Sequence, residues 1–206
     1  MPEKRYEFVE LPALPPSMSR RGSAAGKLLG KVILVVLGWK VKGAFPDTPK
    51  FLIVAAPHTS NWDAFIGLAA ALRLNLDVNF FAKHGAFRPP LGWILRALGG
   101  VPVNREVPRG LVGDAIRAFE ERDTFVLGIA PEGTRKKLDR WKTGFHRIGR
   151  GANVPAVLVA LDFGRKTIGP IATIDLTDDL DHDLSVISRH FEGIQGRNPE
   201  LFTPPV

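Results

Sequence analysis

The feature that most constrains the fold is the alternation of short apolar runs with helical patterns. Residues 51–56 (FLIVAA) and 154–161 (VPAVLVAL) are almost wholly apolar and are bounded by turn residues. Such runs are typical of strands that are buried on both faces of a parallel sheet. Residues 109–122 carry a helical stripe instead, with apolar side chains at Leu111, Val112, Ala115, Ile116 and Phe119. The sequence therefore predicts an α/β fold, a single layered domain with a mixed, partly parallel sheet flanked by helices.

Further elements follow from the same patterns. Strands are expected at 77–83, 101–103, 124–129 and 167–174, and helices at 23–40, 61–72, 89–98 and 185–193. Pro89 fits the first turn of its helix, where a missing amide hydrogen costs nothing.

Composition excludes several classes of protein. The 206 residues include no cysteine, which excludes disulfides, cysteine zinc sites, iron–sulfur clusters and a thiol nucleophile. The five histidines are scattered, so no metal site is expected. The net charge is +7, with +5 in residues 1–50, +7 in 51–174 and −5 in 175–206. A basic body of this kind indicates an anionic partner.

The first motif whose side chains could take part in catalysis is PHTSNWD, residues 57–63. His58 follows a buried strand and precedes a helix, and ligands of open α/β sheets bind at that end of a strand. If the chain folds back there, the Asp63 carboxylate can reach the imidazole, fix its tautomer and leave the other ring nitrogen as a base. A structural interpretation is also open, because Ser60 and Asp63 have the spacing of a helix capping box.

Two further motifs follow strands. PEGTR, residues 131–135, offers a glycine for close backbone approach and Arg135 for a phosphate. GGVPVNR, residues 99–105, places Arg105 just beyond a short strand. A basic stretch extends to Arg150, and a solvated basic face is the structural alternative for it.

Taken together, these motifs resemble the glycerolipid acyltransferase family, the lysophosphatidate acyltransferase group, over residues 50–165. PHTSNWD is similar to the His-x4-Asp block with Pro57 in place of the usual Asn, and GGVPVNR is similar to the second block with Pro102 in place of Phe. PEGTR resembles the Glu-Gly-Thr-Arg block, and residues 154–159 resemble the fourth block with Leu158 in place of a proline.

The resemblance implies transfer of an acyl group from acyl-CoA or acyl carrier protein, as co-substrate and without a cofactor, to the hydroxyl of a lysolipid. The first expected acceptor is 1-acylglycerol-3-phosphate, in phospholipid biosynthesis, and another lysolipid, such as a lyso-aminolipid, is the alternative. By resemblance His58 is the general base and Asp63 orients it. The acceptor and its phosphate would be bound by Arg105, Glu132, Gly133, Thr134 and Arg135.

Three other functions compete with this interpretation. A nucleic-acid binder fits the charge, but the sequence contains no recognised nucleic-acid motif, so no nucleic-acid partner is expected. A hydrolase with Ser60 as nucleophile would need three residues of one turn to form a triad. A non-catalytic lipid-binding protein is disfavoured by the intact His58 and Asp63 pair.

The N-terminal part is expected to contact a membrane without crossing it. Residues 28–39 are apolar but interrupted by Lys31, and their longest unbroken run, 32–39, is well short of the roughly 20 residues that span a bilayer. No cleavable signal peptide is expected. We expect an arm and a membrane-surface helix at 1–42 and the acyltransferase domain at 43–206, peripheral on the cytoplasmic face of the membrane. A helix packed on the core is the alternative for 23–40.

Overall fold

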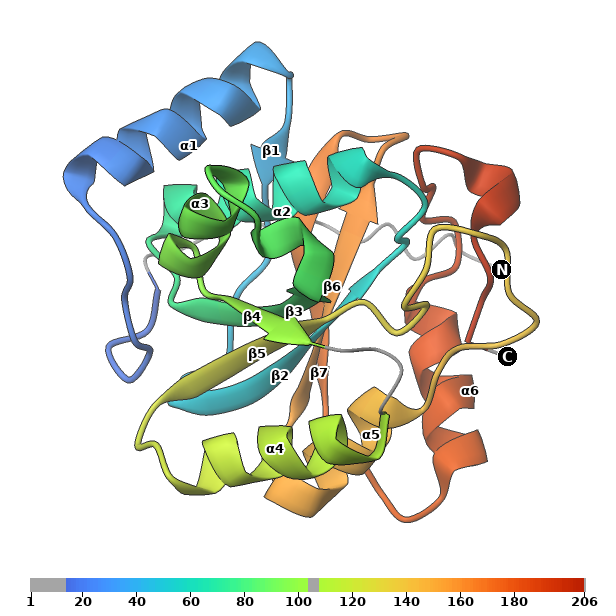
Figure 1. Cartoon of the computed structure of the whole chain (residues 1–206). Helices are drawn as coiled ribbons and strands as arrows, with labels where there is room; N and C mark the ends of the chain where they lie inside the picture. Colours follow the sequence, from blue (N-terminus) through green and yellow to red (C-terminus); the bar gives the residue numbers. More distant parts are fainter. Residues whose placement is uncertain (1–13, 104–107, 206) are drawn as a thin grey trace.

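The computed structural model describes residues 14–103 and 108–205, and its strands form one mixed sheet (Figure 1). The order across the sheet is β1-β7-β6-β2-β5-β3-β4. Neighbouring strands are parallel, except that β6 and β7 are antiparallel. The strands are β1 (Lys40–Val41), β2 (Lys50–Ala56), β3 (Val78–Lys83), β4 (Gly100–Val103), β5 (Phe125–Ile129), β6 (Ala156–Asp162) and β7 (Thr167–Ile174). The predicted α/β class with a partly parallel sheet is confirmed.

Helices cover both faces of this sheet. They are α1 (Ala24–Val36), α2 (Asn61–Leu74), α3 (Leu91–Ala97), α4 (Pro108–Glu120), α5 (Gly144–Ala152) and α6 (Leu180–His190), with short 3₁₀ turns η1 (His84–Phe87) and η2 (Pro199–Leu201). In Figure 1, α1 and α2 lie above the strands and α4 and α5 below them. The molecule therefore has three layers with the sheet in the middle.

The central strand β2 supplies both hydrophobic cores. Leu52 and Val54 pack with α4, α5 and α6 on one face, whereas Phe51 and Ile53 pack with α1 and α2 on the other. All four are at most 7% exposed. This period of two is the alternation of side chains along a strand, and burial on both faces explains why the run is uninterrupted in the sequence.

The structure differs from the predicted elements mainly in the C-terminal half. Helix α5 is absent from the predicted elements, because its three glycines (Gly144, Gly149 and Gly151) disfavour a helix. Tertiary packing overrides that preference, since Phe145 and Ile148 are buried in the core. Helix α6 begins at Leu180 and not at 185, because Asp179 caps it by accepting a hydrogen bond from the His182 amide.

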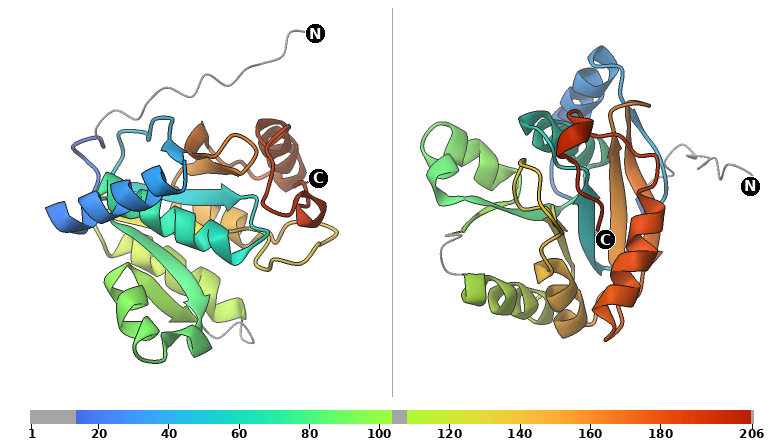
Figure 2. Two further views of the ribbon diagram at one scale, coloured as in Figure 1. Left: turned by 90° about the horizontal axis from the view of Figure 1, so that it is seen from above. Right: turned by 90° about the vertical axis from the view of Figure 1, so that its right-hand side faces the viewer.

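Helix α1 packs on α2 by one narrow face and exposes the other. Gly30 and Leu34 are buried, and the view from above in Figure 2 shows α1 lying outside α2. The opposite face presents apolar side chains that are 49–77% exposed: Leu28, Leu29, Val32, Val35 and Val36. The two interpretations of this segment are thus compatible, because a helix packed on the core still has an apolar outer face.

The predicted boundary between residues 42 and 43, which separates the N-terminal arm and helix from the rest of the chain, remains a prediction about function. Structurally, β1 precedes that point and pairs with β7, and Trp39 is buried against Phe163. Across residues 14–103 and 108–205, every helix is too short or too polar to span a bilayer.

The close contact between α1 and α2 generates the first prediction. A Cβ atom at Gly30 would lie 2.5 Å from the Arg73 nitrogen and 2.6 Å from the Ala69 carbonyl oxygen, both backbone atoms. Gly30→Ala should therefore push the helices apart and lower the free energy of unfolding by roughly 1–3 kcal/mol, measured by urea denaturation.

Gly67→Ala is the matched control, because a Cβ atom there meets nothing within 4 Å. It should be neutral or stabilise by up to about 1 kcal/mol through helix propensity. Equal effects at the two positions would contradict the close packing of α1 on α2.

Candidate active site

The candidate site lies where parallel strands of the sheet end. β2 is parallel to both of its neighbours, β5 and β6. On the far side of β5, strand β3 is parallel to β5, and β4 is parallel to β3. The turn 57–60 after β2 and the loop 130–143 after β5 therefore emerge at the same edge. This is the edge at which open α/β sheets bind ligands.

His58 and Asp63 face each other in this turn. The His58 Nδ1 atom lies 3.4 Å from Asp63 Oδ2, slightly beyond a well-formed hydrogen bond. The Asp63 side chain is 1% exposed and that of His58 is 23% exposed. A carboxylate at Nδ1 favours the tautomer with hydrogen on that atom, so the partly exposed Nε2 is the nitrogen available to take a proton.

Asp63 also caps helix α2. Its two carboxylate oxygens accept hydrogen bonds of 2.6 Å from the Ser60 amide and the Ser60 hydroxyl. Burial tends to raise the pKa of Asp63, but the hydrogen bonds from His58 and Ser60 outweigh it and hold the pKa below its ordinary value. One carboxylate thus serves both roles that the sequence left open. The Ser60 hydroxyl donates to Asp63, an arrangement that does not support Ser60 as a nucleophile.

Glu132 joins the two loops of the site. Its Oε1 atom accepts a hydrogen bond of 2.6 Å from the His58 amide, across 74 positions of sequence. The residue is 1% exposed. The structure therefore turns this carboxyl towards the protein backbone, whereas the resemblance implied that it contacts the acceptor.

The environment of Glu132 favours its neutral form. Burial raises its pKa to about 7, the His58 amide opposes the rise, and the negative charge of Asp63 adds to it. The second oxygen, Oε2, is buried and lacks a hydrogen-bond partner among the described residues. Two neighbouring carboxyls therefore differ, with Asp63 ionised and Glu132 close to half protonated at neutral pH.

The other residues of the PEGTR motif have different surroundings. Gly133 has φ 62°, a backbone conformation that favours glycine, and Thr134 accepts a hydrogen bond from the Lys136 amide. Arg135 is exposed, and its guanidinium donates to Asn61 in the first turn of α2. Arg105 lies outside the described residues. No three acidic or histidine side chains are grouped as metal ligands in the part of the chain that the structure describes.

Sequence reasoning missed four contributors to the site. Thr59, next to His58, is 2% exposed and is bound by Asn198 from the C-terminal segment. Trp62 and Phe65 are about two-fifths exposed and, with Asn61, line a hollow beside the turn. Spacing could not reveal Asn198, which is 139 positions from Thr59, whereas the exposed aromatic pair at helical spacing was a visible signal.

Comparison with known proteins gives a consistent result. A family model described as Acyltransferase matches residues 41–162. A chloroplastic 1-acyl-sn-glycerol-3-phosphate acyltransferase of Brassica napus is 33% identical over 110 residues, which are 50% of this chain and 32% of that protein. A chloroplastic protein of the same description from Arabidopsis thaliana is 31% identical over 121 residues, 56% of this chain and 32% of that protein. The matched part is thus about a third of the length of these relatives.

A solved structure shows the same fold. The crystal structure of the 1-acyl-sn-glycerophosphate acyltransferase PlsC from Thermotoga maritima matches with a TM-score of 0.57 at 22% identity. The match covers 82% of this chain and 75% of that one.

The unusual environment of Glu132 gives a prediction for stability. Because the folded protein holds a proton on Glu132 up to a pKa of about 7, whereas the ordinary pKa of the group is 4.5, this group lowers the free energy of unfolding as pH rises between those values. Glu132→Gln keeps an acceptor for the His58 amide and removes the ionisation. The free energy of unfolding of this variant, relative to that of the unaltered protein, should increase by up to about 3 kcal/mol between pH 5 and 8.

Urea denaturation of both proteins at several pH values measures this difference, in which the contributions of other groups cancel. A difference that is constant with pH would show that the Glu132 pKa is ordinary.

Proposed function

The chain belongs to the acyltransferase family, and from this premise we propose that it transfers a fatty acyl group from a thioester donor to the hydroxyl of a lysolipid. The observation that carries the proposal is the buried Asp63 carboxylate opposite Nδ1 of a partly exposed His58, at the ligand-binding edge of the sheet. A general base oriented in this way typically contributes 10²–10⁴-fold to a rate.

The chemistry follows from that arrangement. His58 Nε2 takes the proton of the acceptor hydroxyl as its oxygen attacks the thioester carbonyl. The carbon–sulfur bond then breaks, and the leaving thiolate receives the proton from the imidazolium. Asp63 stabilises the imidazolium while it exists, and its lowered pKa keeps it ionised for that purpose. A thioester is already activated, so a positioned base suffices without a covalent enzyme intermediate.

The proposed acceptor is 1-acylglycerol-3-phosphate, the molecule in the names of the plant relatives. Arg135 supports a phosphate ligand because its guanidinium is exposed and is held by Asn61 at the first turn of α2. Arg105 is proposed as a second phosphate ligand from the sequence alone. Another lysolipid would use the same base with a different head-group site. The donor is acyl-CoA or acyl carrier protein.

Apolar surface near the site supports a lipid substrate at a membrane. Trp62 and Phe65 meet edge to face with ring centroids 5.6 Å apart and remain partly exposed beside the catalytic turn. Helix α1 adds its apolar outer face, with Lys27 and Lys31 also exposed. We propose that this face lies in the membrane interface and that the protein takes its acceptor from one leaflet.

The direct test is an acyl-transfer assay with radiolabelled donor and a panel of lysolipids. Parallel reactions use acyl-CoA and acyl carrier protein, each with 1-acylglycerol-3-phosphate, a lysophospholipid and a lyso-aminolipid. A diacyl product supports the proposal and identifies the acceptor. Release of free fatty acid alone would indicate a hydrolase, and the absence of both products would reject the proposed reaction.

Variants of the pair test the roles of its members. His58→Ala should lower kcat by about 10²–10⁴-fold without unfolding the protein, because the residue contributes a base from a partly exposed turn. Asp63→Asn should lower kcat nearly as much and should also destabilise α2, since it loses the charge that both His58 and Ser60 contact.

Ser60→Ala separates these effects, because it removes the hydroxyl bond to Asp63 and keeps the carboxylate opposite His58. It should cost about 1 kcal/mol of stability, typical of a lost cap, with a much smaller loss of kcat. If Asp63→Asn is as active as Ser60→Ala at equal stability, Asp63 acts only as a cap.

Membrane docking by α1 is tested with vesicles. Leu28→Gln/Val32→Gln/Val35→Gln replaces three exposed apolar side chains of α1 by polar ones that still favour a helix. This variant should sediment less with phosphatidylglycerol vesicles than the unaltered protein and should lose activity on bilayer lipid. Activity on a short-chain, water-soluble acceptor should be retained.

Lys27→Gln/Lys31→Gln is the matched control for charge. Each lysine near an anionic surface contributes about 1 kcal/mol, so this variant should bind less to anionic vesicles but equally to neutral ones. Unchanged sedimentation of the apolar variant would assign docking to another surface.

A further inference from the structure

We infer that Asn198, in the segment that follows α6, is a positioning residue for the catalytic turn and acts through Thr59. This inference rests on the proposed function for its kinetic consequence. Asn198 lies beyond residues 41–162, the range that the family model matches.

Asn198 binds Thr59 in two ways. Its side-chain amide donates a hydrogen bond of 2.9 Å to the Thr59 carbonyl oxygen, and its backbone amide donates one of 3.2 Å to the Thr59 hydroxyl. Thr59 is 2% exposed, so its hydroxyl oxygen and its carbonyl oxygen accept these bonds in a buried environment, where an unmade bond is costly.

The turn lies between β2 and α2, and side chains bind several of its backbone polar groups. Glu132 binds the His58 amide, Asn198 binds the Thr59 carbonyl, and Asp63 binds the Ser60 amide. Three consecutive residues are therefore held by three side chains from separate parts of the chain. Asn198 and Asp63 bind the carbonyl and the amide of the same peptide group, Thr59–Ser60, and Glu132 binds the amide of the peptide group before His58.

The segment around Asn198 also lies close against the turn. A Cβ atom at Gly196 would be 2.8 Å from the Thr59 hydroxyl oxygen and 3.1 Å from the Pro57 Cβ, so glycine permits this approach. The Arg197 guanidinium lies 5.0 Å from the centre of the Trp62 ring. The segment thus contacts the turn on both sides of His58.

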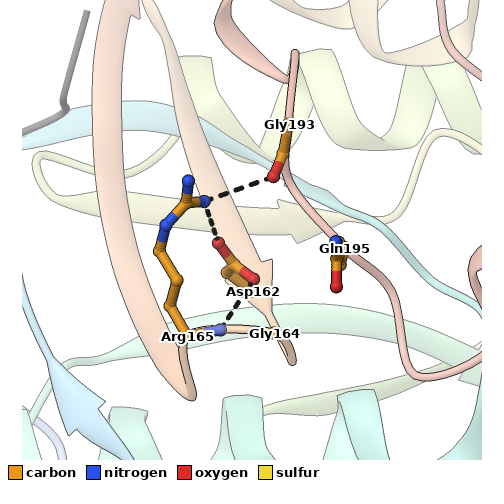
Figure 3. Close-up of a pocket in the computed structure, with 5 residues that line it drawn as sticks. All are labelled: Asp162, Gly164, Arg165, Gly193 and Gln195. Atoms are coloured by element: carbon orange, nitrogen blue, oxygen red, sulfur yellow. Dashed lines mark hydrogen bonds and ion pairs between the residues drawn. The ribbon is translucent and has the colours of Figure 1, made fainter. Parts of the chain in front are cut away.

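The segment is anchored at both of its ends. At the start, Arg165 donates to the Gly193 carbonyl oxygen and to Asp162, as Figure 3 shows. At the other end, the Trp141 indole donates a hydrogen bond of 2.7 Å to the Thr203 carbonyl oxygen. Figure 1 shows this red segment beside the yellow loop 130–143 that carries Glu132. Asn198 therefore bonds to the turn from a fixed support.

The kinetic consequence follows from the geometry of the base. His58 must keep Nδ1 towards Asp63 while Nε2 reaches the acceptor hydroxyl, and a displacement of about 1 Å can cost on the order of 10²-fold in rate. Loss of the Thr59 anchor should loosen this geometry and leave substrate-binding surfaces unchanged.

The test compares Asn198→Ala with Arg165→Ala in the full chain. Asn198→Ala should lower kcat by roughly 10- to 100-fold, with KM for donor and acceptor within about twofold of the unaltered protein. Asn198→Asp should not restore kcat, because a carboxylate cannot donate to the Thr59 carbonyl. Arg165→Ala removes one bond to the same segment, at the Gly193 carbonyl oxygen, together with the ion pair to Asp162, and leaves both Asn198 bonds in place. It should lower the melting temperature while kcat stays within about twofold.

Amide hydrogen exchange provides a readout that does not need activity. Asn198→Ala should speed exchange at residues 58–60, and Arg165→Ala should not. If the exchange of residues 58–60 is unchanged in Asn198→Ala, or if both variants lose kcat in proportion to stability, the positioning role is rejected. An unaltered protein without acyl transfer would reject the proposed function, and the exchange result would still decide whether Asn198 holds the turn.

Discussion

The hydrogen bond from the His58 amide to Glu132 is the contact on which the site depends. It joins the turn after β2 to the loop after β5, and these loops meet because the two strands are adjacent and parallel. Burial of an ionised carboxyl is unfavourable unless the group is paired. For Glu132 this penalty raises the pKa to about 7. Glu132 thus lowers the stability of the folded protein while it holds the turn of the candidate site in place.

The two carboxyls of the site show how neighbouring groups of one kind acquire different properties. Both are buried, but Asp63 has hydrogen bonds to both of its oxygens and Glu132 to one. The first therefore has a lowered pKa and the second a raised one. Only an ionised Asp63 can stabilise an imidazolium, and the raised pKa of Glu132 reduces the second negative charge beside it.

Helix α1 shows a second division of roles, this time between the faces of one element. Gly30 and Leu34 fix the helix on α2, and the exposed valines and leucines lie on the other side. Because α2 carries Asp63 in its first turn, the proposed contact of the outer face of α1 with a membrane would hold the candidate site at a defined distance from the lipid. The close contact of Gly30 with α2 would make that distance rigid.

The sequence by itself determined the local motif and the described strands other than β1, which lies at the end of the predicted helix 23–40. The apolar runs of β2 and β6 are local patterns, and the His58–Asp63 spacing lies within one turn. Only the tertiary structure decided three other features: helix α5, the burial of Glu132, and the contact of Asn198 with Thr59. Each depends on free energy gained between distant segments: core burial of Phe145 outweighs the cost of glycine in a helix, and hydrogen bonds across 74 and 139 positions leave no periodic signal.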